Sequence, residues 1–401
     1  MRVLVTTSRM PFGLGLIRRL AEAGNEVLAS DSYEVAPGSH SRYVSRRFVT
    51  APARSDPAAF CADVERIARE QAVDVIVPTW EDVFYLSTRR ERLGEVARLY
   101  AAPFPSLARL HDKWSFAELV SSLGIPVPTT AVARSDAELR EAIARFPRYF
   151  ARAAFSRGGV ALLTNTGPLA GHLSPDDVHP SPDSPWLVQE FVDGPMLCTY
   201  STLHDGRATA HCAYRAPLQW QHSTGIQFES LAGGETLAHV ERIGGELGYT
   251  GQISFDFVDA PDGLRIIECN PRTTDGVLLM SPTQLAGGVL DDSRPLELTP
   301  PGELTQLDFA VFAELFTEGL RQTPRTIRDL IEVRGADRGW HDALPTLYSF
   351  LALAHHERLN IGHRKALLSA MSADVCWDGE DIPGMTPEDA AALRRLRASG
   401  P

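Results

Sequence analysis

The chain has few cysteines, and their arrangement excludes the structures that cysteine usually builds. Only five cysteines occur among its 401 residues, and no two of them stand in a C-x-x-C spacing. A small, odd number of scattered cysteines is typical of reduced thiols in a cytoplasmic protein. The sequence therefore predicts a cytoplasmic location, and neither a disulfide framework nor a zinc site.

Long apolar runs and an excess of basic residues are also missing. No uninterrupted apolar stretch approaches the roughly 18–20 residues of a membrane span, and the N-terminus becomes polar at residues 6–9, too early for the core of a signal peptide. The chain carries 39 Lys and Arg against 51 Asp and Glu, a net charge of −12, whereas binding to nucleic acid requires clustered Lys and Arg. We therefore expect neither a membrane nor a nucleic acid as partner.

The composition is that of an ordinary globular protein, with 44% hydrophobic and 22% charged residues. Two predicted strands, 2–6 and 27–30, flank a helical pattern, and a predicted helix at 60–71 followed by a third strand at 73–78 repeats this order. The repeat predicts an α/β fold with an open parallel sheet. Gly13 and Gly15 lie in the first turn, but Arg18 stands where a G-x-G-x-x-G motif needs its third glycine. The turn is therefore a weak indication of dinucleotide binding.

The most informative stretch is a predicted β-hairpin around an Asp-Gly turn. Its two antiparallel strands place Asp256 near Glu268, with Asn270 two residues further on and on the same side. Two carboxylates and an amide oxygen suit Mg²⁺, and Arg272 follows at the strand exit, where its guanidinium can clamp an anion. The alternative is that the two acids are ordinary solvent-facing residues of a strand.

This hairpin resembles the metal-binding signature of the ATP-grasp superfamily of ATP-dependent carboxylate ligases. The signature has an acid or Gln on one strand and E-x-N-P-R on the next, and here Asp256 precedes Glu268-Cys269-Asn270-Pro271-Arg272. The similarity is strongest to the carbamoyl-phosphate-synthase-like members and to the amino-acid ligases of biosynthetic pathways. It covers residues 1 to about 300.

The resemblance implies three parts of the chain. Residues 1–104 are expected to form a Rossmann-like pre-ATP-grasp domain with a parallel sheet. Residues 105–300 are expected to form the two-lobed ATP-grasp module, whose lid lobe spans about 127–187. The resemblance does not cover residues 301–401, whose sequence pattern predicts a mostly helical C-terminal region.

Three positions upstream of the hairpin match the family's nucleotide-binding residues in the right order. Lys113 occupies the place of the first nucleotide lysine, just before a helix, and Arg152 that of the second, as in the carbamoyl-phosphate-synthase-like branch. Gly158 and Gly159 match the loop that covers the phosphates, where the lack of a Cβ lets backbone N–H groups approach. Taken alone, the lysine would be a solvated surface residue and the glycine pair a simple turn.

The next matching segment resembles the hinge between the two lobes of the grasp. The resemblance implies that Glu190 and the backbone of Val192 contact the adenine edge, with packing from Phe191. The family usually has a glutamate shortly after the hinge glycine that binds the ribose, and residues 195–198 here contain no acid. The implied hinge residues are Gln189, Glu190, Phe191 and Val192.

Three further residues are weaker candidates for contacts with substrate. Arg215 is a candidate for stabilising the charge of an acyl phosphate, and the alternative is a strand-edge arginine paired with an acid. Glu81 follows a Pro-Thr pair after the third predicted strand, where it either orients a substrate ammonium or caps the next helix. Thr224 is the third candidate for substrate binding.

Together, these motifs imply an enzyme that uses ATP and Mg²⁺, with Mn²⁺ as an alternative ion. The resemblance implies that Asp256, Glu268 and Asn270 hold the metal, and that a carboxylate held by Arg272 or Arg215 becomes an acyl phosphate. A small amine then displaces phosphate to give an amide, ADP and phosphate.

Two other interpretations stay open at the level of sequence. One keeps the acyl phosphate but changes its fate, to carbamoyl-phosphate-like or thiol-ligating chemistry. The other is a nucleotide-binding protein without turnover, which the missing hinge glutamate favours. A homodimer is a further open alternative, because nothing in the sequence reports the oligomeric state.

Overall fold

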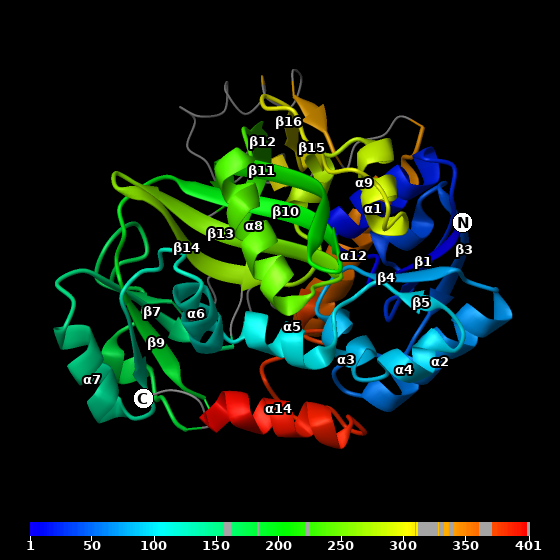
Figure 1. Cartoon of the computed structure of the whole chain (residues 1–401). Helices are drawn as coiled ribbons and strands as arrows, with labels where there is room; N and C mark the ends of the chain where they lie inside the picture. Colours follow the sequence, from blue (N-terminus) through cyan, green and yellow to red (C-terminus); the bar gives the residue numbers. More distant parts are fainter. Residues whose placement is uncertain are drawn as a thin grey trace.

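The computed structural model has the predicted α/β fold, built from a parallel sheet, a small antiparallel sheet and a large antiparallel sheet (Figure 1). The N-terminal unit lies on the right in that view, the small lobe on the left, and the large sheet between and above them. The structure describes residues 1–155, 162–182, 184–220, 224–308, 310–311, 328, 333–336, 341–360 and 371–398.

The N-terminal unit is a five-stranded parallel sheet in the order β3-β2-β1-β4-β5. Its central strand β1 is fully buried at Val3, Leu4 and Val5, as expected for a parallel sheet covered on both faces. The elements are β1 (Arg2–Thr6), α1 (Pro11–Glu22), β2 (Glu26–Asp31), β3 (Val44–Val49), α2 (Pro57–Glu70), β4 (Val75–Pro78), α3 (Asp82–Ser87), α4 (Arg90–Gly94) and β5 (Arg98–Leu99).

The carboxyl ends of these strands carry charged side chains that already have partners. Asp31 ends β2, and its Oδ1 lies 2.6 Å from the Nη2 atom of Arg9, which follows β1. Arg18, the residue in place of the third glycine, points its Nε at Asp342 Oδ2 across 2.9 Å. The acid at the end of β2, where a dinucleotide's ribose would bind, is thus occupied by an arginine of the same sheet.

The sequence pattern over 107–123 predicts a single helix, and this is wrong because the structure has two helices there. They are α5 (Phe104–His111) and α6 (Lys113–Ser122), separated at Asp112, which has an extended conformation. The Asp112 side chain accepts a hydrogen bond from Ser115 N at 2.8 Å and so caps the second helix. Lys113 is therefore the first residue of α6 and not a residue before it.

The small lobe is an antiparallel sheet in the order β6-β9-β7-β8, with one helix on one face. Tyr149, Ala151 and Val188 point towards that helix and form a separate small core with its residues. Arg152 and Phe150 alternate with them and lie on the other face, which is turned to the large sheet. The elements are β6 (Thr130–Ala133), α7 (Asp136–Ala144), β7 (Tyr149–Ala153), β8 (Leu163–Thr164) and β9 (Trp186–Glu190).

The large sheet has the order β14-β13-β10-β11-β12-β16-β17, with β15 paired to β11. Helix α8 covers one face, where His211 Nε2 lies 3.0 Å from the Thr236 hydroxyl of the helix and His239 stacks on Phe257. Its elements are β10 (Met196–His204), β11 (Arg207–Trp220), β12 (Thr224–Leu231), α8 (Gly234–Leu247), β13 (Gly251–Ala260), β14 (Gly263–Asn270), α9 (Pro282–Leu290), β15 (Glu297–Leu298), β16 (Leu304–Gln306) and β17 (Arg334–Gly335).

The C-terminal region contributes both strands and helices. β16 and β17 extend the large sheet beyond residue 300, which the helical pattern did not predict. Helices α12 (Leu344–Asn360) and α14 (Pro387–Ala398) lie where helices were expected, and α14 packs along α5 at the bottom of Figure 1. Within this region the sequence pattern also predicts helices over 307–320 and 326–332, and these two ranges lie almost entirely outside the described residues.

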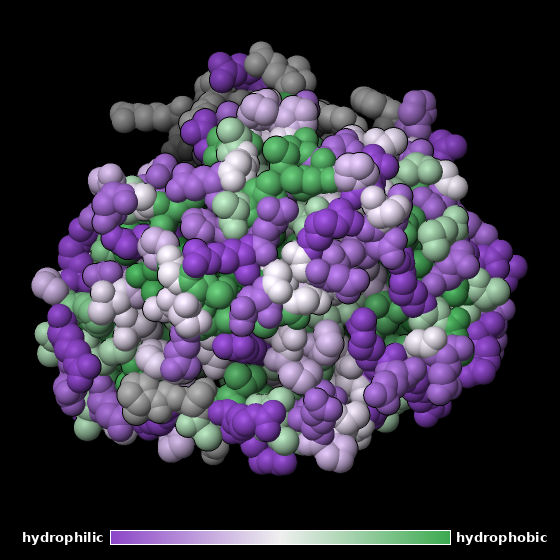
Figure 2. All heavy atoms as spheres, viewed as in Figure 1, coloured by the Kyte–Doolittle hydropathy of each residue, from purple (hydrophilic) through white to green (hydrophobic). Residues whose placement is uncertain are grey.

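The face shown in Figure 2 is largely polar, and one group of apolar side chains on it lies near β15 and β16. Three exposed leucines in this part of the chain are Leu296, Leu298 and Leu304. Among the described helices, none is both long enough and apolar enough to cross a membrane.

Candidate active site

The hairpin β13–β14 brings the two predicted metal-binding acids directly opposite each other. Asp256 pairs with Glu268 across the two antiparallel strands, and Asn270 pairs with Ser254 two positions away. All these side chains share the face of the sheet opposite α8, because residues paired across strands point to the same side. Asn270 Nδ2 donates a hydrogen bond to Asp256 Oδ2 at 3.4 Å.

Two cations from different parts of the chain converge on Glu268. Lys113 Nζ, in the first turn of α6, lies 3.6 Å from Glu268 Oε1. Arg152, on β7 of the small lobe, donates from Nη1 to Glu268 Oε2 and from Nη2 to Ile267 O at 2.9 Å. The lysine and arginine side chains are only 3% and 10% exposed. One carboxylate thus faces two buried positive charges.

These contacts move the pKa values of the two acids in opposite directions. Burial works to raise the pKa of Glu268, but the charges of Lys113 and Arg152 outweigh it and lower that pKa well below its usual range. Burial raises the pKa of Asp256, and the neighbouring charge of Glu268 raises it further. Glu268 is therefore firmly ionised. Ionisation of Asp256, in contrast, destabilises the folded protein, and a bound cation would offset this destabilisation.

The donor set fits a hard cation shared with a phosphate ligand. The described residues contain no cluster of three or more His, Cys, Asp or Glu side chains that could hold a metal by themselves. Two carboxylates and an amide oxygen leave most of the coordination to other ligands, as Mg²⁺ sites that use substrate phosphates do. In addition, Arg152 Nε is a buried N–H without a hydrogen-bond partner in the described part of the chain. The residues present therefore fit a metal together with a phosphate.

Arg272 is held beside the hairpin by a stack and by polar contacts of its guanidinium. Its guanidinium carbon lies 3.6 Å from the centre of the Trp80 ring. Its Nη2 donates to Asn270 Oδ1 at 3.0 Å, and its Nε lies 3.9 Å from Glu81 Oε1. Trp80 stacks in turn on Phe12 at 5.3 Å between ring centroids. The arginine thus lies between the N-terminal unit and the hairpin that carries Asp256 and Glu268.

Glu81 does not cap the helix that follows it. It precedes α3, yet among the described contacts its side chain makes no cap hydrogen bond there. Instead, Glu81 is completely buried, and its Oε2 accepts a hydrogen bond from the backbone N–H of Trp377 at 2.8 Å. The capping alternative is therefore wrong, and the carboxylate connects the C-terminal region to Arg272.

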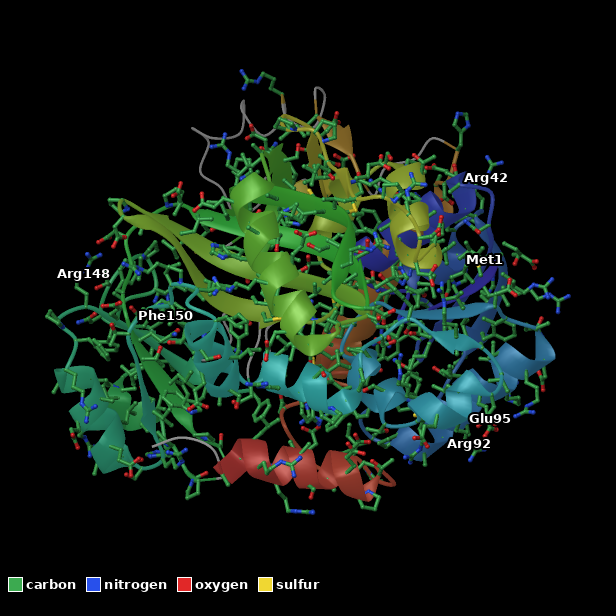
Figure 3. The ribbon with its side chains drawn as sticks, in the orientation of Figure 1. Met1, Arg42, Arg92, Glu95, Arg148 and Phe150 are labelled. Atoms are coloured by element: carbon green, nitrogen blue, oxygen red, sulfur yellow. The ribbon has the colours of Figure 1, made fainter. Side chains whose placement is uncertain are left out.

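The predicted hinge joins β9 of the small lobe to β10 of the large sheet. Gln189 donates from Nε2 to the Thr130 hydroxyl at 3.0 Å, and Glu190 Oε1 accepts from the Thr129 N–H at 2.8 Å. The Phe191 ring lies 4.6 Å from the guanidinium carbon of Arg148, which Figure 3 labels together with Phe150 on this lobe. Val192 follows in the same connection. These contacts hold the segment between the lobes, and its role towards adenine stays a prediction.

The structure does not bring Arg215 to the site. Arg215 alternates along β11 with Tyr214, whose position aligns with Cys198 and through it with Asp256. It therefore lies on the α8 face of the sheet, opposite the carboxylates. There it is about half exposed and pairs with Glu229 at 2.8 Å, as the alternative interpretation expected.

Three other predicted residues cannot be placed in the site. Gly158 and Gly159 lie outside the described residues. Thr224 opens β12 opposite Trp220, and only its backbone is described. Their predicted roles stay predictions.

Sequence reasoning missed Asp275, which stands three residues after Arg272 in the exit from β14. The neighbouring Thr274 hydroxyl lies 2.6 Å from Ser254 Oγ, so this exit folds back onto the face that carries the carboxylates. Burial raises the pKa of Asp275 to about 7, although Arg272 partly offsets the effect. An acid so close after the E-x-N-P-R motif was the available signal.

The arrangement of two lobes around an acidic hairpin defines an ATP-grasp fold, and comparison with solved structures supports it. The chain is similar to N5-carboxyaminoimidazole synthetase from Staphylococcus aureus complexed with ADP, with a TM-score of 0.61 and 12% identity over 82% of this chain and 97% of that one. It is also similar to phosphoribosylamine–glycine ligase from Thermotoga maritima, with a TM-score of 0.57 and 15% identity over 76% and 78% of the two chains.

A third similar structure is the biotin carboxylase domain dimer of Hydrogenobacter thermophilus 2-oxoglutarate carboxylase, in complex with ADP, its magnesium salt and bicarbonate. Its TM-score is 0.55, with 14% identity over 73% of this chain and 70% of that one. No family model and no curated protein matches the sequence. At these identities the structural likeness establishes the fold.

Proposed function

We propose that the chain is an ATP-dependent ligase that joins a small carboxylate to an amine through an acyl phosphate. The observation that carries the proposal is the convergence of Lys113 and Arg152 on the two oxygens of Glu268, beside Asp256. Two buried cations beside two paired acids can bind the phosphates and the metal ion of a metal–triphosphate. The ADP-bound and magnesium-bound structures of similar fold support the same ligand.

Each residue of the site has a task in this reaction. Asp256, Glu268 and Asn270 would hold Mg²⁺, which when bound neutralises the charge of the phosphates. Lys113 and Arg152 bind the phosphate oxygens from two sides and so hold the γ-phosphoryl group in place. Segment 189–192 fixes the adenine edge between the lobes, and the two lobes exclude water from the acyl phosphate.

Arg272 is the group that binds the carboxylate substrate. It is stacked on Trp80 and fixed by Asn270, so its guanidinium is oriented before the substrate arrives. A carboxylate oxygen held beside the phosphates attacks the γ-phosphorus, ADP leaves, and the carboxylate becomes an acyl phosphate. The amine then attacks the acyl carbon and releases phosphate.

Asp275 suits the proton transfer that the second step needs, because an ammonium group must lose a proton before it attacks. Its pKa of about 7 lies near neutral pH, and Arg272 lies within its electrostatic reach. Hydroxylamine is already unprotonated at neutral pH and traps acyl phosphates without a base. We therefore expect Asp275→Asn to form the hydroxamate at the wild-type rate, whereas its rate of amide formation should fall about 100-fold.

The test of the proposed function is ATP consumption with Mg²⁺ over a panel of small carboxylates and amines, with ADP, AMP and phosphate measured separately. ADP and phosphate that form only when both a carboxylate and an amine are present would establish the ligase. AMP and pyrophosphate would contradict the acyl-phosphate route. ADP formed with a thiol instead of an amine would favour thiol ligation, and ATP binding without turnover would favour a nucleotide-binding protein.

A further inference from the structure

The carboxyl edge of the N-terminal sheet is occupied by a segment of the protein itself. In open α/β sheets this edge is where ligands usually bind. Here it holds residues 374–380, which we call the C-terminal segment. The segment contacts Arg9 after β1, Ser32 after β2 and Glu81 after β4. A piece of chain 296 to 365 positions away from its partners thus lies where a ligand would.

One end of the C-terminal segment is anchored by a buried ion-pair network. Asp374 Oδ1 lies 2.7 Å from Arg9 Nη1, and Asp374 Oδ2 accepts from Arg9 Nη2 at 3.1 Å. Asp374 O also accepts the backbone N–H of Arg54 at 2.9 Å. The Arg9 side chain is only 2% exposed and keeps Asp31 as a second partner. The Asp374 carboxylate therefore pairs with the Arg9 guanidinium in the way that the carboxylate of a bound ligand would.

The middle of the C-terminal segment is fixed by Trp377, which is completely buried. Its ring packs on Phe84 at 4.7 Å and against Phe104 and Phe155, both at 5.4 Å between centroids. It also lies 5.9 Å from the ring of His111, two residues before Lys113. A large aromatic side chain packed on four rings holds its own backbone in one place.

That backbone reaches the active site through Glu81. The N–H of Trp377 donates to Glu81 Oε2 at 2.8 Å, and the other oxygen lies 3.9 Å from Arg272 Nε. Because Glu81 is completely buried, its charge acts on Arg272 with little screening by solvent. The position of the arginine therefore depends on a carboxylate that the C-terminal segment orients.

We propose that the C-terminal segment is a built-in ligand of the N-terminal sheet that positions Arg272 through Glu81. Glu81 is then a positioning residue, not a contact for the ammonium of a substrate. The proposal rests on the proposed function only in assigning Arg272 to the carboxylate substrate. It gives the C-terminal region, which the sequence motifs do not cover, a part in building the active site.

The test compares three single variants by the reactivity of Arg272. Glu81→Gln keeps an acceptor for the Trp377 N–H but removes the charge beside Arg272. Asp374→Asn loosens the anchor while Arg9 keeps Asp31. Asp378→Asn is the matched control, because Asp378 lies on the same segment but is 42% exposed and pairs with Arg54 at 2.7 Å.

The readout is the rate at which phenylglyoxal modifies Arg272, followed by peptide mass spectrometry. In the wild type we expect slow modification, since Arg272 is only 7% exposed. Glu81→Gln and Asp374→Asn should each raise the rate about tenfold, which is the lower end of the effect that losing a positioning partner has on metal affinity or activity. Asp378→Asn should leave the rate unchanged. If both main variants keep the wild-type rate, or the control changes as much as they do, the proposal is overturned.

A double-variant cycle separates positioning from a general loss of stability. If Asp374 acts on Arg272 through Glu81, the double variant Glu81→Gln/Asp374→Asn should equal the stronger single variant. Effects that simply multiply would contradict the proposal. Circular dichroism and thermal unfolding show whether each variant is folded, and Glu81→Gln decides alone if Asp374→Asn is not.

Turnover provides a second readout once a carboxylate substrate is known. Both main variants should raise the KM for that carboxylate about tenfold and leave the Kd for Mg-ATP unchanged, because the phosphate site is not touched. An unchanged KM would contradict the proposal. A wild type that turns over no substrate would count against the proposed function alone, since the modification rate does not require turnover.

Discussion

Arg152 on the small lobe and Glu268 on the large sheet form an ion pair that joins the two sides of the candidate active site. Lys113 approaches the same carboxylate from α6. Glu268 thus balances the positive charge of both cations. Under the proposed function, the phosphates of a nucleotide would compete with Glu268 for these two cations, and binding would change a contact that joins the two lobes.

Glu268→Gln should separate nucleotide binding from turnover. The substitution removes the charge that competes with phosphate for the two cations, and we expect tighter ATP binding in the absence of Mg²⁺. Turnover with Mg²⁺ should fall by about 100-fold or more, because one ligand of the metal is lost. Calorimetric ATP binding with EDTA and an ADP-release assay measure the two effects.

The control for this variant is Glu229→Gln, which removes a glutamate on the α8 face of the same sheet. It should change neither ATP binding nor turnover. Wild-type turnover in Glu268→Gln would contradict the metal assignment. Equal loss in both variants would mean that the sheet, and not the site, is affected.

Asp256→Asn should stabilise the protein without ligands, and the gain in unfolding free energy should increase with pH. The folded state raises the pKa of Asp256, so it binds a proton more tightly than the unfolded chain and loses stability as pH rises through that pKa. Asparagine cannot ionise. We expect a gain of about 1–3 kcal/mol in unfolding free energy at about pH 8.

Thermal and denaturant unfolding at about pH 5 and about pH 8 check this expectation. The gain should shrink at the lower pH, where Asp256 is protonated in the wild type as well. Addition of Mg-ATP should stabilise the wild type and not the variant, because only the wild type offers both carboxylates. A variant that is less stable at both pH values would contradict the inference that the ionised Asp256 side chain destabilises the folded protein.

The hairpin was predictable from sequence because its determinants are local. The Asp-Gly turn and the alternation on both sides fix the register, and Asp256 and Glu268 are only 12 positions apart. The convergence of Lys113 and Arg152 was reached only through the family resemblance, since no local pattern brings two lobes together.

Other features depend on contacts that no local pattern reports. Glu81 and Trp377 are 296 positions apart, and nothing near either residue points to the other. Whether Arg215 lies on the same face as the carboxylates or on the face that α8 covers could not be predicted. Alternation in the sequence shows which residues share a face, but not which face the helix covers. Asp112 is a residue type that often caps a helix, so the break between the two helices could have been predicted there. The apolar pattern continues across Asp112, however, and therefore indicated a single helix.

Arg215→Gln tests the role that the sequence predicted for this residue. The guanidinium is about half exposed and pairs with Glu229 on the α8 face of the sheet, opposite the face of Asp256. Exposed ion pairs contribute little, and we expect a change of at most about 0.5 kcal/mol in stability and no change in turnover. Steady-state kinetics and thermal unfolding measure both, and a large loss of kcat would restore the catalytic role.

Met196→Glu tests whether the missing hinge glutamate weakens nucleotide binding. Met196 opens β10 just after the hinge, is 40% exposed, and shares the face of Cys198 and Asp256. A carboxylate there can accept hydrogen bonds from two ribose hydroxyls, so we expect ATP to bind about tenfold more tightly. Met196→Gln is the matched control, because it adds similar bulk with a weaker acceptor. Equal affinity in all three proteins would mean that another residue already binds the ribose.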